Sequence, residues 1–269
     1  MVPWAKRVDG VRGSDAAHKA AGLASDTDRF VIIDGDNIPD PEFFNLQLSI
    51  NDANRDCVFR WKARNHVNGL IYGNGGISCW TKEFVANMRT HEATDGRAES
   101  LVEFCFEPNY WAMNDCYSTT HPCATPFQAW RAGFREGVKM CLDRGHKPEL
   151  AEFTQRVHNR NLDHLTVWHA VGMDVDQGAW AIAGAKQGTY LTMLSSWDYT
   201  KVQDFGELEY LWNTQVKMRD PLEILDHVGQ ELDYRLEISN VVLTAKASKF
   251  FKHHYKSNFV NKGIMVRDQ

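Results

Sequence analysis

The sequence predicts an α/β protein with a mixed sheet flanked by helices and a helical C-terminal region. Short apolar runs typical of strands alternate with helical patterns up to about residue 195, and only helical patterns follow after that point. The chain has 269 residues, of which 43% are hydrophobic, so it is long enough to bury a sizeable core. We therefore expect a sheet domain over residues 1–195 and a helical region over residues 196–269.

Each expected element follows from a local pattern. Apolar strand-like runs cover residues 30–33, 57–61 and 101–106. The first run is continuous, as expected of a strand buried on both faces. Helical periodicity covers residues 14–24, 81–89, 126–141, 148–157, 205–216, 221–232 and 246–259, with Ser14 or Asp15 as the N-cap of the first helix. Residues 190–194 fit a strand or a helical turn, and the glycine-rich residues 68–77 predict a loop or tight turn.

Composition excludes several classes of protein. The net charge of −5 argues against a uniformly basic nucleic-acid-binding protein, so a polyanion would have to meet a local patch. The N-terminus carries no apolar signal region, and no stretch reaches the roughly 20 apolar residues of a membrane span. The six cysteines form no Cys-x-x-Cys pair, which argues against a zinc ribbon or a thioredoxin-type site. We expect reduced thiols in a cytoplasmic protein that does not bind a membrane.

Two carboxylates, Asp34 and Asp36, directly follow the first apolar run. In open α/β sheets, ligands bind just beyond the carboxyl ends of strands. Gly35 permits a turn that lets the two side chains converge. Two hard oxygen ligands suit Mg²⁺ or Mn²⁺, which can in turn hold a diphosphate. The alternative is an Asx-type turn that only ends the strand.

An ordered set of motifs surrounds these carboxylates. The motifs are AKRVDGVRG at residues 5–13, AHKAA at 17–21, VIIDGDN at 31–37, NGLIYGNGG at 68–76 and PFQAWRAGFREGVKM at 126–140. The set resembles nucleotide-sugar glycosyltransferases of the Rossmann-like GT-A fold, in which a glycine-led helix start precedes a strand that ends in Asp-x-Asp. It looks closer still to a bacteriophage and virus group of these enzymes. The resemblance covers roughly residues 3–195.

The resemblance implies a role for each matching residue. Asp34 and Asp36 correspond to the carboxylates that hold the metal and the sugar nucleotide, usually a UDP-sugar. A helix N-terminus with a nearby cation suits phosphate, and the glycine segment would let donor and acceptor approach the backbone. The residues implied to contact the donor are Arg12, Gly13, His18, Lys19, Asp34, Asp36, Asn37, Gly75 and Gly76. A plain hairpin turn is the alternative for the glycine segment.

One feature departs from the family pattern. Members of the GT-A fold normally begin with a strand whose end holds the nucleotide base. That strand would lie upstream of Pro3, so it either lies outside this sequence or has its place taken by another segment. This departure leaves the identity of the base open.

The candidate catalytic base lies between the glycine segment and the next predicted helix. An inverting transferase needs a carboxylate that accepts the proton of the acceptor hydroxyl, whereas a retaining enzyme does not. The stretch EPNYWAMNDC offers Glu107 and Asp115. We favour Asp115, because it follows a predicted strand at the place where the fold usually keeps its base. Both could equally be solvated loop acids.

A histidine is the expected third metal ligand, because the resembled family often recruits one late in the chain. His169 follows a short apolar run in LTVWHAVGMD and is our candidate. The competing histidines are His121, His158, His164, His253 and His254.

Two groups of basic residues are candidate phosphate contacts. Arg131, Arg135 and Lys139 recur every four residues, so they share one face of a predicted helix. Residues 239–267 contain no acidic residue, and their lysines include Lys249, Lys252 and Lys256. Aromatic residues at four-residue spacing in that segment are expected to pack inward. Either group fits a nucleic-acid footprint or the solvated face of a packed helix.

Two classes of function fit these features. The first is a metal-dependent glycosyltransferase, and its best-fitting acceptor is a hydroxymethylated pyrimidine in phage DNA, within the host cytoplasm. Such a base would have to leave the stack to reach the pocket. Protein, lipid and polysaccharide acceptors are alternatives. The second class is a non-catalytic nucleic-acid-binding accessory protein. A nucleotidyltransferase also places paired aspartates at a strand end and is the alternative among enzymes.

Overall fold

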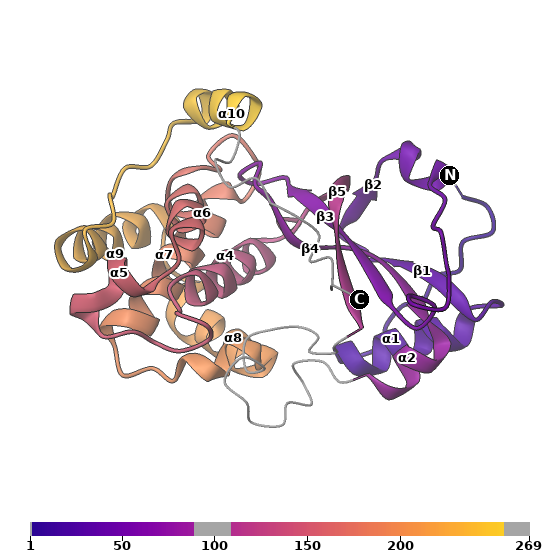
Figure 1. Ribbon diagram of the computed structural model, residues 1–269. Helices are drawn as coiled ribbons and strands as arrows, with labels where there is room; N and C mark the ends of the chain where they lie inside the picture. The colour runs from indigo at the N-terminus through magenta and orange to yellow at the C-terminus, as the bar shows by residue number, and fades with distance from the viewer. Residues whose placement is uncertain (1, 89–108, 256–269) are drawn as a thin grey trace.

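The chain folds into two parts that lie side by side (Figure 1). A computed structural model describes residues 2–88 and 109–255, so the expected strand at 101–106, Glu107 and Lys256 lie outside the described residues. One part contains a mixed sheet with α1 and α2 against it, and the other contains α4 to α10. The predicted α/β class and mixed sheet are confirmed.

The described strands form one sheet in the order β1-β4-β3-β5-β2. Their bounds are β1 (Arg29–Ile33), β2 (Asn37–Pro39), β3 (Val58–Asn65), β4 (Ile71–Thr81) and β5 (Tyr110–Thr120). β3 and β5 are parallel, and the other neighbouring pairs are antiparallel. β1, β3 and β5 therefore run in one direction, and their carboxyl ends lie at the same end of the sheet.

The two edge strands, β1 and β2, are joined by only three residues, Asp34, Gly35 and Asp36. Four strand spacings would separate the edges of a flat five-stranded sheet by about 19 Å. The link from Ile33 to Asn37 spans at most about 14 Å when extended. The sheet must therefore curl at this end, and β2 indeed contacts β4 as well as β5.

Apolar clusters cover both faces at the centre of the sheet. α1 (Ser14–Ala24) and α2 (Lys82–Asn87) lie against one face, where Trp80 and Val85 are buried. The short helical turn Pro41–Asn45 covers the other face, with Phe43 against Trp61 at 5.0 Å between ring centroids. β1 itself is an edge strand and Val31 is 45% exposed, so the prediction that this strand is buried on both faces is wrong.

The glycine-rich segment is not the predicted loop, because β4 runs straight through it. The pairing of β3 with β4 shifts from Trp61–Ile77 to Ala63–Tyr72, so residues 73–76 form a wide bulge inside one long strand. Gly73 and Gly76 have φ values of +64° and +80°. Glycines permit this bulge, while the apolar residues on either side keep the strand paired.

The helical part begins soon after Thr120 rather than near residue 195. Its main helices are α4 (Pro126–Met140), α6 (Asn159–Ala170), α7 (Gly178–Leu194), α8 (Phe205–Leu211), α9 (Pro221–Leu236) and α10 (Ala245–His254). The helices predicted from residues 126, 205, 221 and 246 are confirmed. Residues 190–194 form the last turns of α7, and residues 148–157 hold only a 3₁₀ turn (Leu150–Glu152) and the short α5 (Phe153–Arg156).

Glycines let α4 and α7 cross at very short range. A Cβ atom at Gly133 would lie 1.9 Å from the Ala181 carbonyl oxygen, and one at Gly184 would lie 2.0 Å from the Trp130 carbonyl oxygen. Both helices are therefore fixed backbone to backbone, and they support the largest apolar cluster of the described residues.

Contacts between β4 and the helices fix the two parts to each other. The Tyr72 hydroxyl donates to Glu136 Oε2 at 2.5 Å, and Trp168 Nε1 donates to the Tyr72 oxygen at 2.7 Å. Leu70 packs in the same apolar cluster as Ala129 and Trp168. The strand that carries the glycine bulge is thus anchored on α4 and α6.

Two further features concern the described residues alone. None of their helices has the length and apolar character that crossing a membrane requires. Their cysteines, Cys57, Cys79, Cys116, Cys123 and Cys141, are free thiols.

Candidate functional site

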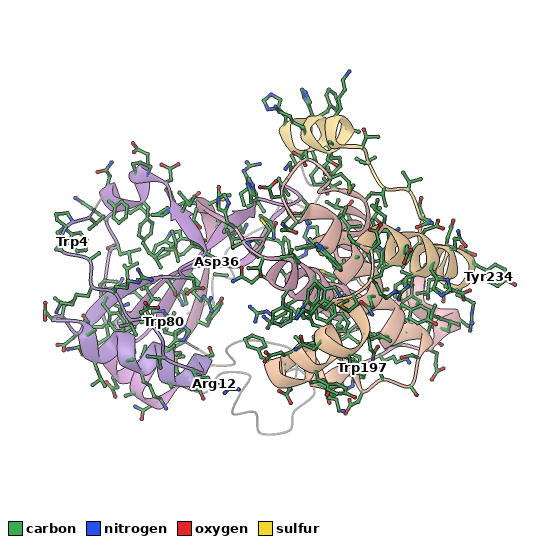
Figure 2. All side chains as sticks on the ribbon, turned by 180° about the vertical axis from the view of Figure 1, so that it is seen from behind. Trp4, Arg12, Asp36, Trp80, Trp197 and Tyr234 are labelled. Carbon is green, nitrogen blue, oxygen red and sulfur yellow. The ribbon has the colours of Figure 1, made fainter. Side chains whose placement is uncertain are left out.

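The turn that joins β1 to β2 presents both predicted carboxylates at the carboxyl end of β1. The Asp34 N–H donates to the Gly76 carbonyl at 2.8 Å, which extends the pairing of β1 with β4 by one residue. The Asn37 N–H donates to the Asp34 carbonyl at 2.9 Å and closes the turn. Asp34 and Asp36 are both exposed. Figure 2 shows Asp36 on the side of the sheet part that faces the helices.

Gly76, rather than Gly35, is the glycine that this turn requires. Gly35 has no left-handed φ, and a Cβ there would meet nothing within 4 Å. A Cβ at Gly76 would lie 2.3 Å from Asn37 Nδ2 and 2.9 Å from Asp34 Oδ2. The missing side chain of Gly76 therefore leaves the space that the Asp34 carboxylate occupies.

Hydrogen bonds from the end of β5 hold Asp36 in place. Asn37 Nδ2 donates to Asp36 Oδ1 at 2.9 Å, and the Ser118 hydroxyl donates to Asn37 Oδ1 at 2.8 Å. The Thr120 hydroxyl donates to Asp36 Oδ2 at 3.3 Å, and the His121 N–H donates to the Asp36 carbonyl at 2.7 Å. Asp36 is thus oriented before any ligand arrives, while each carboxylate oxygen keeps a further lone pair.

Sequence reasoning missed Ser118 and Thr120 as supports of the site. Their signal is a run of three hydroxyl residues, Ser118 to Thr120, at the end of a strand. The pairing of β2 with β5, which brings this run to Asn37, joins segments about 80 residues apart.

The charges around Asp34 are of both signs. Although Asp34 keeps exposed surface, burial of its carboxyl group among neighbouring atoms raises its pKa above 3.8. Arg60 opposes this shift in pKa, the charge of Asp36 adds to it, and His18 opposes it. A cation beside the two carboxylates would offset their mutual repulsion, although Arg60 and His18 already place positive charge near Asp34.

Four of the residues predicted to contact the donor, Arg12, Gly13, His18 and Lys19, lie in or just before α1. Gly13 is the N-cap of α1 with a φ of +94°, so the predicted cap at Ser14 or Asp15 is wrong. His18 Nδ1 lies 2.8 Å from the Ser14 carbonyl oxygen, and its ring meets the edge of Trp80 at 5.5 Å. Arg12 and Lys19 are exposed, and the picture places Arg12 on the inward side of the sheet part (Figure 2). His18 and Asp34 are near enough for their charges to interact.

His169 does not join the two aspartates. It lies in α6 with 1% exposure, and its Nε2 is 3.1 Å from the Thr189 hydroxyl of α7. Burial, followed by the charge of Lys186, lowers its pKa to about 3. Among the described residues, no group of three or more His, Cys, Asp and Glu side chains could hold a metal. The prediction that His169 is the third metal ligand is therefore wrong, because His169 is a structural residue between two helices.

The candidate base Asp115 lies in β5, on the strand that also carries Ser118 and Thr120. It is exposed and sits in an irregular stretch, between Ala112, which pairs with Arg60, and Cys116, which pairs with Lys62. Burial and the charge of Arg160 lower the pKa of Lys62, and Asp115 opposes that shift. Asp115 is therefore accessible on a strand whose end supports the candidate site.

The three basic residues of α4, Arg131, Arg135 and Lys139, are partly buried rather than fully exposed to solvent. The guanidinium groups of Arg131 and Arg135 lie 4.7 and 5.2 Å from the ring centroid of Phe205. Burial lowers the pKa of both groups. Lys139 Nζ is 3.1 Å from Glu136 Oε1. Arg131 is the member whose charge also interacts with Asp36.

The C-terminal lysines divide between two roles. Lys252 Nζ is 2.7 Å from Asp174 Oδ2, and the two side chains are only 17% and 11% exposed. Lys252 is therefore a structural contact, which corrects its expected place in a nucleic-acid footprint. Lys249 is exposed.

Comparisons with known proteins found no relative of this chain: no protein-family model, curated protein or solved structure matches it.

Two carboxylates, with no third protein ligand among the described residues, suit a metal site that is completed by water and phosphate. Mg²⁺ and similar hard cations are usually bound by one or two carboxylates, with waters and substrate phosphates completing the shell. Asp34 and Asp36 are such a pair, and the missing side chain of Gly76 leaves room for the Asp34 carboxylate itself. The residues present therefore fit a cation that is completed by a phosphate ligand.

Proposed function

We propose that the protein is a metal-dependent glycosyltransferase that moves a sugar from a nucleotide sugar, best matched by a UDP-hexose, to a hydroxyl acceptor. One observation carries the proposal: Asp34 and Asp36 are exposed at a strand end and are positioned by Gly76 on one side and β5 on the other. The ordered motifs that resemble GT-A enzymes support this assignment, and a GT-A-like sheet is part of the proposal.

We assign each residue the role that the resemblance implies and that its position allows. Asp34 and Asp36 would hold Mn²⁺ or Mg²⁺ together with the diphosphate of the donor. The metal would offset the negative charge of the departing nucleoside diphosphate. The start of α1, with Arg12 and His18, would orient the diphosphate through helix N–H groups and positive charge.

The chemical step exchanges one carbon–oxygen bond for another. The acceptor oxygen bonds to the anomeric carbon, and the bond from that carbon to the diphosphate breaks, with its electron pair leaving on the diphosphate. Asp115 accepts the acceptor's proton. Asp115→Asn should lower kcat and leave donor binding unchanged, because only the proton acceptor is lost. Unchanged kcat would remove Asp115 from this role.

A hydroxymethylated pyrimidine in DNA is the acceptor that we propose. The resemblance to phage enzymes and the exposed lysines of α10 support this choice. A flipped base would present its hydroxymethyl group to the anomeric carbon.

Mass spectrometry of hydroxymethylated DNA, incubated with a panel of nucleotide sugars and Mn²⁺, tests the proposal. The parent protein should add one hexose mass per modified base, and EDTA should abolish the addition. Asp36→Asn should remove most of the activity, whereas Asp26→Asn, the same change on an exposed carboxylate, should not. Full activity in EDTA would contradict the metal role. Incorporation from a nucleoside triphosphate instead would favour the nucleotidyltransferase alternative.

A further inference from the structure

One face of α10 is exposed, basic and aromatic. Residues of the helix divide by helical spacing into an inward set, which includes Ser248, Phe251 and Lys252, and an outward set. We call the outward set the α10 outer face, and it comprises Lys246, Lys249, Phe250, His253 and His254. Figure 1 shows α10 at the periphery of the molecule.

The inward residues hold α10 rigidly on the rest of the protein. Lys252 pairs with Asp174 and also donates to the His66 carbonyl at 3.2 Å. The Gly172 N–H donates to the Ser248 hydroxyl oxygen at 3.3 Å, and the Tyr255 hydroxyl donates to Asp163. The outer face is therefore presented on a fixed helix, and a partner would not have to order it first.

Phe250 is the unusual member of this face. It is 65% exposed, and its ring lies 4.2 Å from the ring of His254, centroid to centroid. Lys246, Phe250 and His254 also line a shallow groove that continues along the helix to Leu243. An aromatic ring that is left in water beside lysines has both a π-face and positive charge to offer a ligand.

The charge pattern selects the class of partner. α10 contains no acidic residue, although the chain as a whole carries a net charge of −5. A polyanion would therefore be attracted to this face and repelled by much of the remaining surface. Stacking on Phe250 needs a base whose face is open, and the bases of a duplex are stacked on each other.

We propose that the α10 outer face binds single-stranded nucleic acid, with one base stacked on Phe250 and the neighbouring phosphates held by Lys246 and Lys249. This inference extends the DNA acceptor of the proposed function, because it places an unpaired strand on a fixed surface of the same protein. The binding itself requires neither the donor nor a metal.

Fluorescence anisotropy of a labelled oligothymidylate, without donor or metal, tests this inference. The parent protein should bind the single strand more tightly than a duplex of the same length. Phe250→Ala should weaken binding by about tenfold or more. Tyr234→Ala, which removes an aromatic ring that is 85% exposed on α9, is the matched control and should have no effect.

Salt dependence tests the role of the two lysines. Replacing Lys246 and Lys249 with Gln should flatten the log–log salt slope by up to about 1.4 on single strands. Lys217→Gln, an exposed lysine in the helical part, should leave the slope unchanged. Circular dichroism should show that every variant is folded.

Several outcomes would overturn the inference. They are equal binding by Phe250→Ala and the parent, tighter binding of the duplex, or binding to vesicles of anionic phospholipid without binding to oligothymidylate. The proposed function is tested separately, because single-strand binding that persists without any sugar transfer would contradict that function and leave this surface intact.

Discussion

The strand-end site and the helical part use polar residues in opposite ways. At the strand end, Asp34 and Asp36 stay exposed while Asn37, Ser118 and Thr120 fix their surroundings. In the helical part, several polar groups are instead buried or largely buried and bonded to structural partners. The pairs are His169 with Thr189, Lys186 with Asn240, Glu136 with Tyr72, and Lys252 with Asp174. The type of residue alone therefore does not identify a functional site in this protein. A polar group that is both oriented by its neighbours and accessible to a ligand does identify one.

Glycines show the same contrast. Gly76 leaves space for a carboxylate that a ligand can reach. Gly133, Gly137, Gly184 and Gly188 leave space for a neighbouring helix backbone, so their role is packing. A substitution at Gly76 should therefore weaken ligand binding, whereas a substitution at one of the packing glycines should destabilise the fold.

The largest effect should come from Gly133→Ala. The added methyl group would lie 1.9 Å from the Ala181 carbonyl oxygen, so α4 and α7 would have to separate. We expect the free energy of unfolding to fall by about 3 kcal/mol or more, despite the better helix propensity of Ala. Urea denaturation measures this change. Gly22→Ala in α1 is the matched control, because its Cβ would meet Val85 at an ordinary 3.4 Å. A similar loss at both positions would contradict the close-crossing account.

The next effect concerns acid stability. The pKa of His169 is lowered to about 3 in the folded protein from an ordinary value of 6.5, so the unfolded chain takes up a proton first as the pH falls. Stability should be lost between about pH 6.5 and 3, with a slope of up to about 1.4 kcal/mol per pH unit. His169→Gln should flatten this slope, whatever its effect at neutral pH. Denaturation curves across this range measure it, and an unchanged slope would show that His169 does not stay neutral.

A smaller effect with the opposite sign is expected at the strand end. The pKa of Asp34 is raised in the folded protein, so its ionised form opposes folding at neutral pH. Asp34→Asn should therefore raise the melting temperature at neutral pH, and the gain should vanish below pH 3.8. Asp26, whose pKa Lys6 lowers, is the control, and Asp26→Asn should bring a slight loss. A fall in melting temperature with Asp34→Asn would contradict the unfavourable burial of the ionised Asp34 carboxylate.

Local patterns predicted much of the fold. The α/β class, the strands from residues 30 and 57 and most helices follow from periodicity within a dozen residues. The glycine segment was misread, because four glycines suggest a loop, while the pairing of Tyr72 and Ile77 with β3 keeps it in a strand. The expected alternation of strands and helices does not continue to residue 195: the last described strand ends at Thr120, and residues 190–194 are the last turns of α7.

The candidate site was predictable only in part. Asp34 and Asp36 stand together in the sequence, so their pattern was visible. The demand for glycine at position 76 and the support from Ser118 and Thr120 arise from long-range pairing, which no local pattern contains. The predictions that His169 binds a metal and that Lys252 contacts nucleic acid were wrong, because the burial of these side chains depends on the packing of α6, α7 and α10.

Titration of Mn²⁺ in the presence of UDP, followed by the electron paramagnetic resonance signal of free Mn²⁺, tests the central claim most directly. The parent protein should bind Mn²⁺, and Gly76→Ala should weaken that binding by about 10- to 100-fold, because its Cβ would displace Asn37 and the Asp34 carboxylate. Gly73→Ala places the same strain at a φ of +64° but meets nothing within 4 Å, so it should bind like the parent. No binding by the parent, or equal binding by Gly76→Ala, would contradict a metal site at Asp34 and Asp36.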